Sequence, residues 1–82
     1  MLGTGTTEKP RLTDSERNLL LHVAAGYDNE GIAERLNVDL VIVINTLARA
    51  IDKLGAKDRH SAALKALRDG HILLEELQSL QG

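Results

Sequence analysis

The segment Val38–Leu54, VDLVIVINTLARAIDKL, constrains the fold of this chain most, because it is apolar almost all the way round. Its β-branched run Val41–Ile44 on its own favours a strand. However, no second strand is available to pair with it, and good helix formers follow it without a break. In a helix, the core-facing side chains would share one face: Val43, Leu47, Ala50 and Leu54. We therefore predict a helix here.

Helix start and stop signals precede this segment. Thr13 and Glu16 have the spacing of a capping box, in which each residue bonds the backbone N–H of the other. Gly26 is suited to end the helix that starts there. Asp28 can then cap a second, short helix. A short second helix that leads by the tight connection Asn37-Val38 into a long third one is typical of a helix-turn-helix.

Similar signals bound the rest of the chain. Asp39 can cap the long third helix, and Gly55 ends it. A fourth helix is predicted from near Asp58 to Asp69-Gly70, and the following tail could add another helical turn or two. The predicted fold is all-α, with four helices and room for an extra short C-terminal helix. We divide the chain into a flexible segment 1–11, a helix-turn-helix domain 12–72 and a tail 73–82.

Composition excludes several classes of protein. The 82 residues suffice for one small domain. The chain has no cysteine, no run long enough to span a membrane and no signal peptide, which suits a cytoplasmic protein. Tyr27 is the only aromatic residue, so stacking platforms for single-stranded nucleic acid are absent. The net charge of −2 gives no basic excess for phosphate binding.

The sequence contains no pattern that indicates catalysis. No nucleophile-base pair or phosphate-binding loop is present, and we expect neither enzymatic activity nor a cofactor. The three histidines, at positions 22, 60 and 71, lack the spacing of metal ligands. We therefore expect no metal, and surface or half-buried structural roles for the histidines.

Many positions resemble the LuxR/GerE type of helix-turn-helix domain, at fixed spacing and without a gap from Leu12 to about Ile72. The matching residues are Leu12-Thr13, Glu16, Leu19-Leu20, Val23-Ala24, Gly26, Asn29, Ile32–Leu36, Val38, Val43, Lys53–Gly55, Arg59, Ala62 and Ala66–Gly70. This resemblance implies the DNA-binding effector domain of a response regulator or quorum-sensing regulator of transcription. It also implies a homodimer that forms through the fourth helix, with Ala63 and Leu67 as candidate contacts.

The departures from this pattern fall on the third helix. Such domains usually place a Thr, a Lys and a His in its first turns, facing DNA. Ile42, Ile44 and Thr46 stand at those positions here. The two isoleucines can neither neutralise a phosphate nor donate to a base edge, although they could touch a thymine methyl group. We therefore expect weakened DNA binding.

Several polar residues of this region are candidates for DNA contact. Asn45 and Arg49 could pair with adenine and guanine, and Thr46 retains a hydroxyl. Basic residues that could hold phosphates follow them: Lys53, Lys57 and Arg59. Each of these residues also has a simpler interpretation. Asn45 and Arg49 could be solvated surface residues. Lys53 and Arg59 could as readily serve packing and ion pairs within the domain.

Two functions therefore stay open. In the first, the chain binds double-stranded DNA as a dimer, with the third helix in the major groove. In the second, the fold has lost DNA recognition, and an apolar patch on the third helix docks a protein partner or a second copy. Val41 and Ile44 would be central to that patch, with Leu40 and Ala48 beside them.

Overall fold

The computed structural model describes residues 11–81, and this part of the chain folds into five α-helices without a strand. The helices are α1 (Asp14–Ala24), α2 (Asn29–Leu36), α3 (Leu40–Leu54), α4 (Arg59–Arg68) and α5 (Leu74–Gln81). The predictions of an all-α fold and of an additional C-terminal helix are confirmed. The segment 1–11, predicted to be flexible, lies outside the described residues except for Arg11.

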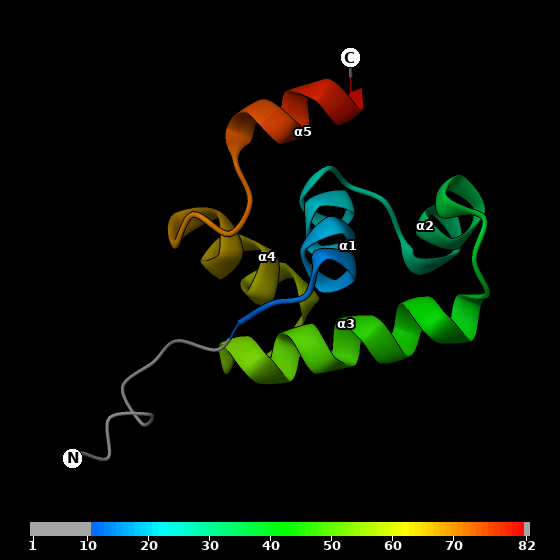
Figure 1. Cartoon of the computed structure of the whole chain (residues 1–82), viewed down its shortest axis with the longest axis horizontal. Coiled ribbons are helices and arrows are strands. Elements are labelled where there is room, and N and C mark those ends of the chain that lie inside the picture. The colour runs from blue at the N-terminus through cyan, green and yellow to red at the C-terminus, as the bar shows by residue number, and fades with distance from the viewer. Residues whose placement is uncertain (1–10, 82) are drawn as a thin grey trace.

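The helix α1 lies at the centre of the fold. It packs against α3, α4 and α5, and α3 packs in addition against α2 and α4. Figure 1 shows α3 running along one side of the molecule, with α5 on the opposite side of α1. One side of α3 therefore faces the core, while no other described helix covers its outer side. No helix among the described residues combines the length and apolarity needed to cross a membrane.

The predicted capping box at the start of α1 is confirmed. The Thr13 hydroxyl accepts a hydrogen bond from the Glu16 amide at 3.0 Å, and the Glu16 carboxylate accepts one from the Thr13 amide at 2.8 Å. The Asp28 carboxylate likewise accepts a hydrogen bond from the Gly31 amide at 2.7 Å and caps α2. These bonds satisfy amides that a helix start leaves without an intrahelical partner.

The ends of α3 fall where the sequence predicts them. Asn37 adopts the left-handed conformation (φ 57°) in the turn between α2 and α3, and Gly55 does the same (φ 63°) after α3. Asp39 occupies the N-cap position, but its side chain makes no capping hydrogen bond. The expected position is therefore right, whereas the expected side-chain cap is absent.

Residues 41–44 lie in α3, which confirms the choice of helix over strand. The core that α3 helps to form is aliphatic. Val43, Leu47 and Ala50 are 0–3% exposed on one side of α3, and Leu54 is half-buried behind them. They meet buried side chains of the other helices, among them Leu20, Ile32, Ala62 and Ala66, and Ile72 of the connection between α4 and α5.

One histidine differs from expectation. His22 is 2% exposed, deeper than the surface or half-buried position predicted for it. Its Nδ1 lies 2.7 Å from the Asn18 carbonyl oxygen, one helical turn earlier. The His22 ring is therefore a part of the domain core that α1 contributes.

Candidate nucleic-acid interface

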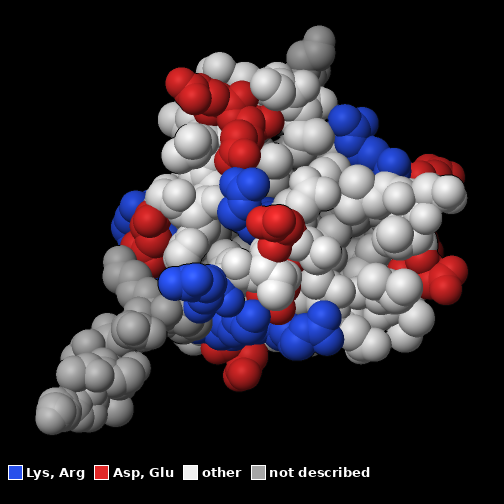
Figure 2. All heavy atoms as spheres, in the orientation of Figure 1, with Lys and Arg blue, Asp and Glu red and all other residues white. Residues whose placement is uncertain are grey.

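The outer side of α3 is divided into an apolar first half and a charged second half, in which the basic Arg49 and Lys53 stand beside the exposed Asp52. In the first half Val41, Ile42 and Ile44 are 58%, 50% and 46% exposed. In the second half the Arg49 side chain is 64% exposed, and Lys53 follows one turn later. Figure 2 shows Lys and Arg side chains gathered over the C-terminal part of α3, while its N-terminal part has none. Positive charge is thus displaced from the first turns toward the end of the helix.

Asn45 and Arg49 form an exposed polar stripe on α3. Both are exposed, and their spacing of four residues places them on one stripe of α3. The Arg49 Nε lies 3.5 Å from a Glu16 carboxylate oxygen, a long contact for a largely exposed guanidinium. Such a contact contributes little and leaves the side chain available for a ligand.

Thr46 does not belong to this stripe. It is 5% exposed, because it lies on the side of α3 that faces α1, in a hollow shared with Asn18 and Leu19. The expectation that its hydroxyl contacts DNA is therefore not supported. The preceding residue, Asn45, carries the exposed polar group instead.

Lys53 is engaged inside the domain. Its Nζ donates to the Glu16 carboxylate at 2.7 Å and to the Arg11 carbonyl oxygen at 3.1 Å. Glu16 is 1% exposed. Burial on its own would raise the pKa of Glu16, but hydrogen bonds from Lys53 and Thr13, together with the Lys53 charge, outweigh it and lower that pKa. The simpler interpretation, an ion pair within the domain, therefore describes Lys53 best.

Arg59 is likewise a structural residue. Its guanidinium donates to the Asn29 side-chain oxygen and, at 2.9 Å, to the Tyr27 carbonyl oxygen. These bonds fix the start of α4 to the start of α2 and to the connection between α1 and α2. Lys57, in the connection between α3 and α4, is exposed. It is the better candidate for a phosphate contact.

The candidate dimer residues on α4 differ in their exposure to solvent. Ala63 is 5% exposed and belongs to the core, so it offers little surface to a partner apart from its place in the lining of the groove described below. Leu67 is half-buried. Leu64, which the sequence interpretation passed over, is 68% exposed.

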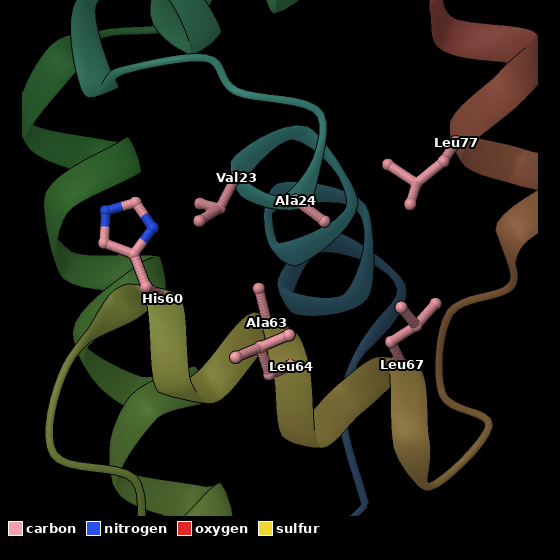
Figure 3. A pocket seen from close by; sticks show the side chains of 7 residues that line it. All are labelled: Val23, Ala24, His60, Ala63, Leu64, Leu67 and Leu77. Atoms are coloured by element: carbon pink, nitrogen blue, oxygen red, sulfur yellow. The ribbon is translucent and has the colours of Figure 1, made fainter.

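An apolar groove of about 290 Å³ lies beside these α4 residues. Figure 3 shows side chains of α1, α4 and α5 around it, with Leu67 and Leu77 extending into the space between α4 and α5. The groove is lined by Val23, Ala24, His60, Ala63, Leu64, Leu67 and Leu77. Its apolar lining can take apolar side chains of another chain.

Comparison with known proteins connects this architecture to a family of regulators. Residues 10–66 match the family model described as bacterial regulatory proteins, luxR family. A curated relative, the transcriptional regulatory protein LnrK of Bacillus subtilis (strain 168), is 35% identical over 72 residues. That match covers 83% of this chain but 33% of the relative, so the chain spans about a third of that protein's length. No solved structure matches the chain.

Proposed function

This chain belongs to the luxR family of bacterial regulatory proteins, and we propose that it binds duplex DNA with α3 in the major groove. The family consists of transcription regulators and not of enzymes, in agreement with the sequence-based expectation. The observation that carries the proposal is the exposed stripe on α3, in which Asn45 and Arg49 stand one turn apart. In helix-turn-helix domains the second helix of the motif presents such a stripe to base edges.

The described contacts suggest a division of labour among the polar residues. Asn45 can pair with an adenine edge and Arg49 with a guanine edge or a phosphate. Lys57 is exposed and can contact the DNA backbone. Lys53 and Arg59 are bonded within the domain, so we assign them to holding α3 and α2 in position.

Binding by one copy should be weak, and a dimer would compensate for this. The net charge is −2, and apolar side chains fill positions of α3 that could have carried cations. Each missing phosphate contact removes one counterion-release contribution. We infer that two copies associate through α4, around the exposed Leu64, and bind half-sites about one helical turn apart. The dimer then binds its site more tightly than either copy binds a half-site alone. A protein with this role works in the cytoplasm.

The experiment that tests this function is a fluorescence anisotropy titration with labelled duplex DNA between about 50 and 200 mM salt. The proposal predicts an affinity that falls as the salt concentration rises, and a loss of affinity in Lys57→Ala. An Asp69→Ala variant, changed at an exposed position after α4, is the matched control and should bind no more weakly than the parent. Absence of salt-dependent binding would overturn the proposal.

A second function has its own support. The exposed apolar residues of the first half of α3 could instead bury against a protein partner or a second copy. Leu40 and Ala48 flank Val41 and Ile44 and are exposed as well. Under that function α3 would carry association and the domain would not bind DNA. Sedimentation of a variant with a charge on α3 distinguishes the two.

A further inference from the structure

We propose that Val41 and Ile42, together with Asn45, read the thymine-bearing edges of A·T base pairs, so that the domain selects A·T-rich duplex DNA through thymine methyl groups. This inference rests on the proposed function, and it names the class of DNA that the same face of α3 recognises. It concerns the chemistry of the first half of the helix, where cations are absent.

The first argument is the exposure of these side chains. Val41 is 58% and Ile42 50% exposed, whereas Val43 on the same turn is fully buried. The core therefore does not need Val41 and Ile42. Val41 projects from the outer side of α3, which no described helix covers, whereas the half-exposed Ile42 lies at its edge and also lines the hollow that Thr46 shares with Asn18. A ligand that covers an aliphatic side chain there removes apolar surface from water, which favours binding.

The second argument is the register. Ile42 precedes Asn45 by three residues and Arg49 by seven, and Val41 precedes Asn45 by four. Residues at these spacings are neighbours on one side of a helix. A ligand that Asn45 and Arg49 contact in a groove would therefore lie against Val41 and Ile42 as well.

Ile44 lies at the edge of this surface. It lines a separate shallow hollow with Asn29, Ala48 and Arg59, on the side of α3 that faces the starts of α2 and α4. The stripe that carries Arg49 runs along the other edge, through Ile42. We therefore leave Ile44 out of the thymine-reading set.

The third argument is the chemistry of the major groove. The thymine C5 methyl is the apolar group that an unmodified base pair exposes there, and aliphatic side chains contact it directly. An aliphatic side chain can neither accept from the cytosine amino group nor donate to guanine. Asn pairs in two bonds with adenine, the partner of thymine. All three side chains therefore favour the same base pair.

The test uses two duplexes of equal length, one of alternating A·T and one in which uracil replaces every thymine. They differ in the C5 methyl groups alone. Each methyl that Val41 or Ile42 buries should raise the affinity for the thymine duplex about fourfold over the uracil duplex. A second pair compares G·C with G·5-methylcytosine, where the added methyl should raise the affinity in the same direction.

Variants assign the effect to α3. Val41→Ala and Ile42→Ala should each lower the ratio of thymine to uracil affinity toward one. Leu74→Ala removes the same kind of group from α5, where the side chain is 62% exposed, and should leave the ratio unchanged.

The outcomes separate the inference from the proposed function. Equal affinity for the thymine and uracil duplexes, with salt-dependent binding to both, overturns the inference and leaves DNA binding intact. Absence of binding to any duplex overturns both. A parent dimer that sediments as a monomer after Val41→Ala places a second copy on this face, and it also overturns thymine reading.

Discussion

The half-buried Lys53 of α3 forms an ion pair with the buried Glu16 of α1, its Nζ 2.7 Å from a carboxylate oxygen that is almost wholly removed from solvent. The same carboxylate caps α1 through the Thr13 amide and lies 3.5 Å from Arg49. One acidic side chain therefore ties the start of α1 to the second half of α3, which carries Arg49 and Lys53.

Removing Lys53 should destabilise the domain. In Lys53→Met the buried Glu16 carboxylate keeps its hydrogen bond from the Thr13 amide but loses its nearest charged partner. Leaving a buried charge less well satisfied costs about 1–3 kcal/mol of the free energy of unfolding. Urea denaturation measures this difference. Lys57→Met, at an exposed position, should change stability by less than about 0.5 kcal/mol. Equal effects of the two changes would contradict a structural role for Lys53.

The pH dependence of stability should follow the lowered pKa of Glu16. A carboxyl group with a lower pKa in the folded state stabilises the fold above its ordinary value, here 4.5, and loses that contribution as the pH falls through the folded-state value. Glu16→Gln should therefore flatten the loss of stability below about pH 4.5, in thermal or urea melts across the acid range.

Part of the acid sensitivity should persist in Glu16→Gln. The pKa values of Asp58 and Glu76 are also lowered, chiefly by hydrogen bonds from the backbone amides of Ser61 and Leu73. Glu75→Gln, at an exposed position of α5, serves as the control. If the control flattened the acid profile as much as Glu16→Gln does, the pair of Glu16 and Lys53 would not be the source.

Asn45 and Arg49 should carry sequence preference. Arg49→Ala and Asn45→Ala should each cost about 1–3 kcal/mol of binding free energy at a preferred duplex and less on random DNA, because base contacts discriminate and phosphate contacts do not. Selection from a random duplex pool followed by competition titrations measures both. Variants that bind both DNAs as the parent does would remove Asn45 and Arg49 from the reading surface.

The sequence predicted most of the fold, because its determinants are local. The capping box of Thr13, the Asp28 cap and Gly55 act within a few residues of themselves. The family resemblance added the arrangement of the helices. The resemblance also placed the expected DNA-facing positions on α3, where Asn45 is exposed.

The roles of individual site residues were less accessible to sequence reasoning, because they depend on contacts between distant segments. Lys53 meets Glu16 across 37 residues, and Arg59 meets Tyr27 across 32. Nothing local to either basic residue reveals such a partner. Thr46 stands three residues after Val43 and four before Ala50, so periodicity alone places it on the core side, whereas the family resemblance placed it among the DNA-facing positions.

Leu64 should be central to self-association. Leu64→Asp places a charge at the most exposed leucine of α4 and should weaken a dimer at least about tenfold, which corresponds to about 1.4 kcal/mol. Sedimentation over a concentration series measures this, with circular dichroism to show that the fold is kept. Ala63→Asp should instead unfold the domain, because Ala63 is buried. A Leu64→Asp protein that associates like the parent would exclude this surface.

A cation at position 44 should strengthen binding. Ile44→Lys adds a charge beside the DNA face and should steepen the salt dependence of the affinity by about one counterion. Leu74→Lys adds the same charge on α5 and should have a smaller effect. Conversion of a dimer into a monomer by Ile44→Lys, without a gain in DNA affinity, would favour the docking function of α3.

The most direct measurement is NMR chemical-shift mapping of the labelled domain during a titration with duplex DNA. If α3 enters the major groove, the largest shifts will fall on the amides of residues 41–49 and on the side-chain NH₂ of Asn45, while those of α5 change little. Shifts confined to α4 and α5, or no shifts at all, would contradict DNA binding through α3.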